Sequence, residues 1–325
     1  MSVDKFTFDP RPKAYDFLNR GFAPDAWTTD APIDRLVPTH CCFCAVQCAI
    51  YLKVAGGKVV GVEPREDFPV NQGRLCPKGV VAYQQVNHPD RLLYPMIRRN
   101  GRLQRASWPE AMDLVVQRIR DIQASCGRDA VAMYGGSSLT TEKTYLIGKF
   151  ARVALGTRHC DYNGRLCMTS AAGANLKAFG VDRAANPIAD LMETDCILAI
   201  GSNIPETFPV AIFYPWMARD RGARLIVVDP RQTQLARTAD IHLQIRPGSD
   251  LALLNSLLHV VIKEGYTDPT FIADHTRGFE AVRDTVERYP PELAAEVCGV
   301  LPEQIVAAAR LYGRSVKAMV VHARG

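Results

Sequence analysis

Five cysteines lie close together near the start of the chain, and four of them have the spacing of a metal site. Two residues separate Cys41 from Cys44, three separate Cys44 from Cys48, and twenty-seven separate Cys48 from Cys76. Thiolates are soft ligands that suit zinc or an iron-sulfur cluster. Zinc ribbons favour two short-spaced pairs, whereas here three ligands share one loop and the fourth is single. The spacing therefore favours a 4Fe-4S cluster over a structural zinc site or a disulfide pair.

The fifth cysteine of this group, Cys42, competes with Cys41 for the first ligand position. Counting from Cys42 leaves only one residue before Cys44, which is a tight reach for two corners of one cube. We therefore expect Cys41, and not Cys42, to bind the cluster.

A single thiol, Cys167, marks a second candidate site. The surrounding segment, residues 161–171, combines turn-forming residues with a basic residue and has no amphipathic strand pattern. This pattern indicates a loop thiol. The alternative is a buried apolar filler, because free cysteine is among the most buried residue types, and the segment by itself does not choose between them.

The elements around the first site predict a small β-rich module. Residues 51–54 and 58–62 form two apolar runs separated by Gly56 and Gly57, which is typical of a β-hairpin directly after Cys48. The turn-forming loop 67–73 then returns the chain to Cys76.

The remainder of the chain alternates strand and helix patterns. Ser107 and Glu110 form a capping box for a helix that begins near Trp108, and a short apolar run over 130–134 ends in a glycine turn before another helical pattern. Strand, turn and helix in this order indicate an α/β layer.

The clearest βαβ unit comprises a buried strand at 196–200, a helix around 208–221 and a second strand at 224–228 that ends at Asp229. A ligand of such a unit lies beyond the carboxyl ends of the strands, where an acid can bind ribose hydroxyls. No Gly-x-Gly-x-x-Gly is present, which disfavours ordinary NAD binding. A third strand at 242–245 leads to a helix that Ser249 or Asp250 would cap, two more helices begin at Pro291 and Pro302, and a last strand covers 318–322.

Composition narrows the class of protein. A chain of 325 residues with 47% hydrophobic content should form two or three packed domains. Its net charge of +5 is mild and spread along the chain, so it does not indicate a nucleic-acid partner. No apolar leader, twin arginine or run of about 20 apolar residues is present, so we expect no membrane partner and a cytoplasmic, reducing location.

Taken together, four segments resemble the molybdopterin oxidoreductases of the dimethyl sulfoxide reductase family. They are the cysteine pattern with its Cys-Pro-Lys-Gly at 76–79, the Asn-Gly-Arg-Leu-Cys-Met at 163–168, the Gly-Ser-Asn-x-x-Glu at 201–206, and the Val-Asp-Pro-Arg at 228–231. Within that family the second segment is similar to that of assimilatory nitrate reductases, whereas formate dehydrogenases typically have His where this chain has Met168. Ala45 and Gln47 stand where the family usually has glycines.

The resemblance implies two molybdopterin guanine dinucleotides that chelate one molybdenum, with Cys167 as the protein ligand of the metal. Lys78 would lie between the cluster and the pterin and assist electron transfer. The guanosine or its phosphates would be held on strand-end loops by Gly201, Asn203, Glu206, Asp229, Arg231, Gly248 and Asp250. The alternative for two or three of these residues is an ordinary capping or turn role.

The fold expected from these patterns is α/β: a small β-rich iron-sulfur module, followed by Rossmann-like α/β domains with mostly parallel sheets. The expected divisions are an N-terminal extension (1–34), the 4Fe-4S domain (35–95), an incomplete α/β domain (96–158 with 315–325), and a Rossmann-like domain that binds a pterin guanine dinucleotide (159–314). Family members continue for hundreds of residues further, so the chain is expected to be the N-terminal part of an enzyme.

The expected activity of that enzyme is assimilatory reduction of nitrate to nitrite, with electrons that arrive through the cluster from a ferredoxin, a flavodoxin or an NADH-linked partner subunit. The alternatives are a formate dehydrogenase of the same family, or a truncated, non-catalytic iron-sulfur protein of electron transfer.

Overall fold

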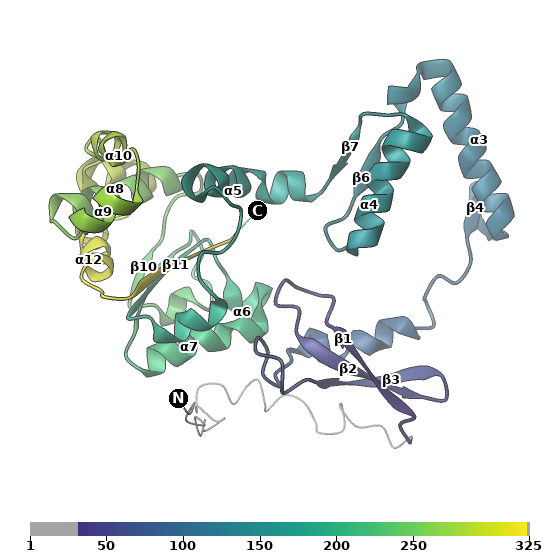
Figure 1. Ribbon diagram of the computed structural model, residues 1–325, viewed down its shortest axis with the longest axis horizontal. Helices are drawn as coiled ribbons and strands as arrows, with labels where there is room; N and C mark the ends of the chain where they lie inside the picture. The colour runs from purple at the N-terminus through teal and green to yellow at the C-terminus, as the bar shows by residue number, and fades with distance from the viewer. Residues whose placement is uncertain (1–31, 324–325) are drawn as a thin grey trace. The chain divides into compact units, whose positions relative to one another are not determined.

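The computed structural model describes residues 32–323, and the extension expected over 1–34 lies almost wholly outside them. The described chain divides into two compact units (Figure 1). Unit 1 comprises residues up to Ala82 together with Ala184–Ala323, and unit 2 comprises Tyr83–Arg183. Among residues 32–323, no helix is both long and apolar enough to cross a membrane.

Unit 1 begins with the expected β-rich module. Its three antiparallel strands, in the order β1-β2-β3, are β1 (Arg35–His40), β2 (Ala49–Ala55) and β3 (Lys58–Pro64). The predicted hairpin is confirmed: β2 and β3 are joined at Gly56 and Gly57, whose positive φ values of 54° and 74° are readily adopted by glycine. After the loop that follows β3, α2 (Pro77–Val80) and the 3₁₀ helix η3 (Ala82–Val86) carry the chain out of the module.

The larger part of unit 1 is a four-stranded parallel sheet in the order β10-β9-β8-β11. Its strands are β8 (Cys196–Ile200), β9 (Arg224–Val228), β10 (Ile241–Leu243) and β11 (Ala318–His322). The expected βαβ unit is present, since η7 (Pro209–Ile212) and α7 (Phe213–Asp220) connect β8 to β9. Val, Ile and Leu dominate the two central strands, as expected for strands covered on both faces.

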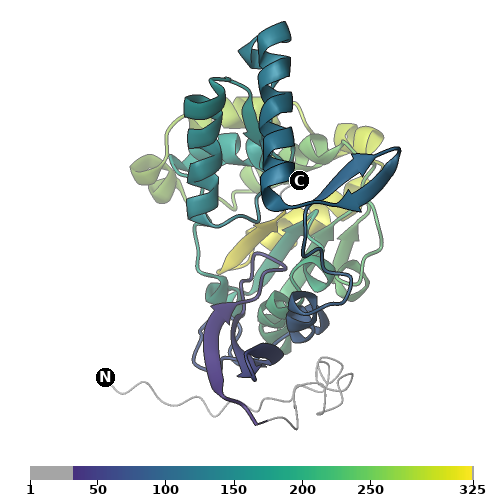
Figure 2. The same cartoon turned by 90° about the vertical axis from the view of Figure 1, so that its right-hand side faces the viewer.

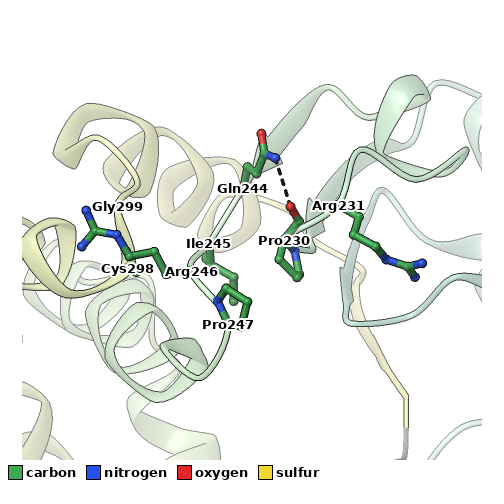
Figure 3. Close-up of a pocket in the computed structure, with 8 residues that line it drawn as sticks. All are labelled: Pro230, Arg231, Gln244, Ile245, Arg246, Pro247, Cys298 and Gly299. Atoms are coloured by element: carbon green, nitrogen blue, oxygen red, sulfur yellow. Dashed lines mark hydrogen bonds between the residues drawn. The ribbon is translucent and has the colours of Figure 1, made fainter.

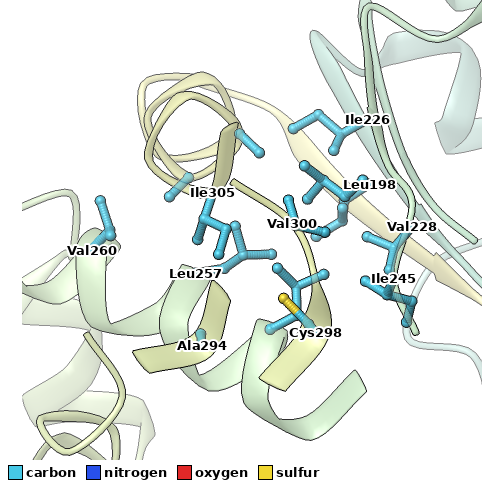
Figure 4. Close-up of a cluster of buried hydrophobic side chains, with 14 of the residues drawn as sticks. Leu198, Ile226, Val228, Ile245, Leu257, Val260, Ala294, Cys298, Val300 and Ile305 are labelled. Carbon is cyan, nitrogen blue, oxygen red and sulfur yellow. The ribbon is translucent and has the colours of Figure 1, made fainter. Parts of the chain in front are cut away.

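Helices on one side of this sheet close the main hydrophobic core (Figure 4). Leu198, Ile226 and Val228 from the strands meet Leu257 and Ile305 from the helices. The helices of this part of the chain are η6 (Ile188–Glu193), α6 (Ile204–Thr207), η8 (Ala236–Thr238), α8 (Asp250–Lys263), α9 (Pro269–His275), α10 (Phe279–Val286), α11 (Pro291–Cys298) and α12 (Pro302–Gly313).

The partner of the last strand differs from the expectation that residues 315–325 belong with 96–158. β11 pairs in parallel with β8, from Ala318 opposite Cys196 to His322 opposite Ile200. Polar contacts set the register at the start of both strands, because the backbone N–H of Asp195 donates to Lys317 O (2.9 Å) and the N–H of Lys317 donates to the Asp195 carboxylate (3.1 Å). A local apolar pattern indicates a strand but does not say which sheet it joins.

Unit 2 is a second, smaller α/β unit (Figure 2). Its elements are the hairpin β4 (Met96–Arg99) and β5 (Arg102–Arg105), α3 (Trp108–Cys126), η4 (Arg128–Ala130), β6 (Met133–Gly135), α4 (Thr141–Lys149), the π-helical η5 (Phe150–Leu155), β7 (Cys160–Tyr162) and α5 (Gly164–Phe179). β6 and β7 are parallel. The predicted N-cap at Ser107 is confirmed, since its hydroxyl accepts from the N–H of Glu110 at 3.3 Å, whereas the Glu110 carboxylate pairs with Arg99. The strand expected at 130–134 begins later, because residues 128–130 form a 3₁₀ turn.

Candidate functional site

The cysteine loop between β1 and β2 is a tight turn that buries two of its four thiols. Cys41 and Cys48 are buried, Cys44 is half-buried and Cys42 is exposed, and Cys76, which precedes α2, is buried as well. The ends of the loop are tied together by the backbone N–H of Cys41, which donates to Cys48 O at 2.8 Å. The loop therefore turns the candidate ligands inward and Cys42 outward.

The buried thiols share one electrostatic environment. Burial, together with the charges of Cys41, Cys44 and Cys76, raises the pKa of the Cys48 thiol to about 12. Burial also raises the pKa of Cys41, which is acted on by Cys42, Cys76 and Cys44. The Cys41 and Cys48 thiols thus each lie within the field of the thiols around them. Such a group becomes fully ionised only when a cationic centre neutralises it.

The donor set fits an iron-sulfur cluster. None of Cys41, Cys44, Cys48 and Cys76 is in a disulfide. Four thiols presented by one loop and one neighbouring segment suit a cluster in which each iron takes its own thiolate.

Asn71, which the sequence analysis treated only as a turn former, braces the two ligand-bearing segments. Its side chain is fully buried, and its Oδ1 accepts from the backbone N–H of Ala49 at 2.9 Å. Its Nδ2 donates to Ala49 O and to Arg74 O, at 3.3 and 3.0 Å. Ala49 directly follows Cys48 and Arg74 lies two residues before Cys76, so one amide fixes the spacing of both segments.

The loop between β3 and Cys76 is anchored on α7. The hydroxyl of the buried Tyr214 donates to Val70 O at 2.7 Å and lies 3.2 Å from Pro69 O. The guanidinium of Arg74 lies 4.1 Å from the ring centroid of Phe213. These contacts join segments more than 100 residues apart in the chain, so no local sequence pattern could have indicated them.

Most of the predicted nucleotide-binding residues lie at one edge of the parallel sheet. Gly201 follows β8, Asp229 follows β9, and Gly248 and Asp250 follow β10. Because the three strands are parallel neighbours, their carboxyl ends meet at this edge. Gly201 has φ +55°, and its N–H donates to Val228 O at 2.8 Å, so the loop after β8 turns across the end of β9.

Asp229 and Arg231 interact with each other at this edge. Asp229 is 5% exposed, and its carboxylate accepts from the backbone N–H of Arg231 at 2.8 Å. The carbonyl of Asp229 accepts from Nε2 of His242 at 2.9 Å. The guanidinium of Arg231, 3.9 Å from the carboxylate, is largely exposed. The pair thus presents a buried acid and an adjacent exposed cation.

Asn203 provides the clearest sign of a missing ligand at this edge. Its side chain is 7% exposed, and its Oδ1 is buried with no hydrogen-bond partner in the described part of the chain. Buried polar atoms without a partner are rare in native proteins. An amide oxygen in this state fits a ligand that donates hydrogen bonds, as a ribose hydroxyl or a guanine amino group does.

The other predicted residues of this edge are exposed. Glu206 lies in α6 and Asp250 is the first residue of α8. The expected cap of α8 differs from the observation: Ser249 occupies the N-cap position, but its hydroxyl donates to Arg246 O at 2.6 Å and does not cap the helix. The tight turn at Gly248 (φ +84°) places the hydroxyl beside that carbonyl.

A groove of about 700 Å³ lies beside the ends of β9 and β10 (Figure 3). It contains Arg231 from the predicted set, together with Gln244 and Arg246, which were not predicted as site residues. The amide of Gln244 donates to Pro230 O at 3.0 Å, and Arg246 donates to Glu296 O at 2.8 Å. The guanidinium groups of Arg231 and Arg246 lie at opposite ends of this lining and point away from each other, so Arg231 is the one left to bind an anionic ligand.

Lys78 and Cys167 complete the predicted set. Lys78 is exposed on α2, two residues after Cys76. The expectation of a loop thiol at Cys167 is wrong, because Cys167 lies in the first turn of α5. The alternative of a buried filler is also wrong, since the residue is exposed. Turn formers at 163–164 begin this helix instead of a loop.

Comparison with known proteins identifies the family. The Fe4S4 domain of the molybdopterin oxidoreductases matches residues 34–88, and the molybdopterin oxidoreductase domain matches residues 91–321. The chain therefore belongs to the molybdopterin oxidoreductase family, and its cofactors are a 4Fe-4S cluster and a molybdenum-pterin.

Relatives of this chain include formate dehydrogenases and nitrate reductases. The chain is 36% identical over 291 residues to the F420-dependent formate dehydrogenase subunit alpha of Methanocaldococcus jannaschii (90% of this chain, 42% of the relative). It is 38% identical over 301 residues to the assimilatory nitrate reductase catalytic subunit of Bacillus subtilis, a match that covers 91% of this chain and 42% of the relative. The solved structure of acetylene hydratase from Pelobacter acetylenicus is similar, with a TM-score of 0.72 and 27% identity, over 87% of this chain and 39% of that one. The chain thus spans about two fifths of the length of these relatives.

Proposed function

We propose that the protein that contains this chain reduces nitrate to nitrite, and that electrons reach the active site through a 4Fe-4S cluster bound by Cys41, Cys44, Cys48 and Cys76. The observation that carries the proposal is Met168, which directly follows the exposed Cys167 at the start of α5. By the resemblance described above, nitrate reductases have Met in this place, whereas formate dehydrogenases typically have His.

Each group of residues has a separate task in this proposal. The bound molybdenum supplies oxygen-atom transfer and accepts two electrons. The thiolate of Cys167 is exposed and would hold the metal. Lys78, as a cation beside the fourth cluster ligand, would favour electron transfer towards the pterin.

The strand-end edge would hold the guanosine and phosphates of the pterin dinucleotide. The Asp229 carboxylate would accept hydrogen bonds from the ribose hydroxyls. The unpartnered Oδ1 of Asn203 would accept a hydrogen bond from the nucleotide. The guanidinium of Arg231 would bind a phosphate. The other predicted residues of these strand-end loops would help to hold the nucleotide, and they are Gly201, Glu206, Gly248 and Asp250.

We also propose an electron donor and a location for this protein. A ferredoxin, a flavodoxin or an NADH-linked subunit would deliver single electrons to the cluster, and we propose a cytoplasmic site of action.

Formate oxidation is the second candidate, because relatives of comparable identity are formate dehydrogenases. The test is a pair of assays of the purified, molybdenum-containing protein: nitrate with a reduced dye as electron donor, and formate with an oxidised dye as electron acceptor. We expect nitrate to be converted to nitrite. Formate oxidation without nitrate reduction would contradict the proposal and support the second candidate.

A third candidate, of a different class, is a non-catalytic electron-transfer protein. The observation that favours it is the set of four candidate cluster thiols in unit 1, which would suffice for electron transfer. Metal analysis separates it from the others: iron without molybdenum in the chain as purified supports electron transfer alone, whereas molybdenum with guanine nucleotide contradicts it.

A further inference from the structure

The first turn of α5 is held in place by Asn163, the residue that joins this helix to β7. We propose that Asn163 is a positioning residue for Cys167: it fastens the helix that carries this thiol to the loop after β6. The inference rests on the proposed function, in which Cys167 binds molybdenum. It concerns how this chain positions the Cys167 thiol, and not whether that thiol binds the metal.

The sheet of unit 2 brings the two joined segments together. β6 and β7 are parallel, with Gly135 opposite Tyr162. The glycine turn after β6, residues 135–138, and the start of α5 therefore leave the sheet at the same edge, side by side.

Asn163 makes three hydrogen bonds across this edge. Its backbone N–H donates to Gly135 O at 3.3 Å, and its Oδ1 accepts from the backbone N–H of Ser137 at 2.8 Å. Its Nδ2 donates to the Ser137 hydroxyl at 3.4 Å. Both ends of the carboxamide thus contact one residue of the neighbouring loop.

The side chain of Asn163 does not perform the task usual for its position. Asparagine at a helix N-cap commonly accepts from an N–H of the first turn, with an extended backbone. Ser107 does this for α3, with φ −76° and ψ 158°. Asn163 has helical dihedrals of −58° and −24° and makes no such bond, so its side chain is committed to the loop and not to its own helix.

Two further contacts hold the same joint. Asp161 and Arg165 form an ion pair at 2.8 Å across the helix start. The ring of Tyr162 lies over Gly164 so closely that a Cβ there would collide with it, and its hydroxyl donates to the Met168 sulfur at 3.5 Å. Both contacts act within the chain segment 161–168, whereas Asn163 connects that segment to a different part of unit 2.

The position of a metal ligand depends on the hydrogen bonds of the structure around it, and removal of such partners commonly lowers activity by about 10- to 100-fold. Without the carboxamide of Asn163, the first turn of α5 would lose its side-chain link to Ser137, and Cys167 would sample more orientations. Asn163→Asp keeps the acceptor for the Ser137 N–H and can also accept from the Ser137 hydroxyl. It should therefore restore most of what Asn163→Ala loses.

The contact itself is tested by amide hydrogen exchange on the 325-residue chain without molybdenum. We expect Asn163→Ala to speed exchange at Ser137, and Asn163→Asp to leave it near the native rate. Asn175→Ala is the matched control, because Asn175 lies in the same helix and its amide donates to Asp182 at 3.1 Å, two turns from Cys167. Unchanged exchange at Ser137 in Asn163→Ala would overturn the inference.

The role towards the metal is tested on the molybdenum-containing protein by electron paramagnetic resonance and by nitrate kinetics. Asn163→Ala should alter the molybdenum signal and lower kcat by about tenfold with little change in KM, and Asn163→Asp should recover both. Cys167→Ser is the reference. If Cys167→Ser leaves the signal unchanged, the proposed function fails. If Cys167→Ser changes the signal and Asn163→Ala does not, only the present inference fails.

Discussion

At the scale of single residues, Cys42 and Cys41 are neighbours with opposite surroundings. Cys41 is 8% exposed and lies among the other three candidate ligands, whereas Cys42 is exposed. We expect Cys42→Ser to keep the broad visible absorbance of the cluster after anaerobic purification. Substitution of Cys41, Cys44, Cys48 or Cys76 by Ser should each bleach or degrade it, because one corner of the cluster loses its thiolate.

The control for this series is Cys126→Ser, which removes an exposed thiol at the end of α3, outside the module. A bleached Cys42→Ser protein beside a brown Cys41→Ser protein would show that the ligand assignment is wrong by one residue.

Asp240 illustrates a charge that stabilises the parallel sheet. The residue as a whole is exposed, but its side chain is only 21% exposed and accepts from the N–H of Leu225 at 2.8 Å. Burial alone would raise the pKa of Asp240. The hydrogen bond from Leu225 and the nearby guanidinium groups of Arg224 and Arg219 outweigh burial and hold the pKa below its usual value.

A carboxyl with a lowered pKa in the folded state stabilises the fold above its ordinary pKa, and this stabilisation is lost as pH falls through the lowered value. We therefore expect Asp240→Asn to reduce the free energy of unfolding by about 1 kcal/mol at pH 7. The difference from the native chain should shrink below about pH 4. Urea unfolding at both pH values checks this, with the exposed Asp220→Asn as a control. A difference that grows towards low pH would contradict the assignment.

At the scale of elements, the loop that carries Cys76 depends on α7. Tyr214→Phe removes the hydroxyl that donates to Val70 O and leaves the ring in place. We expect a loss of about 1 kcal/mol in stability, because a part-buried carbonyl loses its donor. We also expect faster loss of the visible absorbance in air, because the loop opens more often. Tyr312→Phe, on α12 and away from the cysteine loop, is the control and should leave the bleaching rate unchanged.

The elements that the sequence predicted well are those with strong local patterns. The buried runs of β8 and β9 and the N-cap at Ser107 each determine their own local structure, and each is confirmed. The helix that carries Cys167 was missed because Asn163 and Gly164 are turn formers that here start a helix.

What could not be predicted depends on distant partners. The pairing of β11 with β8, and the contacts of Asn71 and Tyr214, join segments that no local pattern relates. For the candidate site, sequence spacing indicated the cysteines and the strand-end loops, whereas the groove beside Gln244 and Arg246 exists only once β9, β10 and α11 are packed.

At the scale of the whole molecule, the cysteine loop and the strand-end edge both belong to unit 1, whereas Cys167 belongs to unit 2. We expect the anaerobically purified chain to contain about four irons. Cys167→Ser should retain this iron while molybdenum binding is weakened, because the two metal sites use residues of different units. Elemental analysis of both proteins checks this. Zinc in place of iron, or loss of iron in Cys167→Ser, would contradict it.

The anchoring of the loop with Cys76 on α7 also has a consequence for the order of events during synthesis. Val70 leaves the ribosome 144 residues before Tyr214, the residue that fastens its loop. At about 5–20 residues per second, this interval lasts roughly 7 to 30 s. During that time the β1–β3 module already has its strands, its ligand thiols and the Asn71 brace, while the anchor on α7 is not yet made. We expect cluster insertion to be easiest in this period, before the Tyr214 hydroxyl holds the loop.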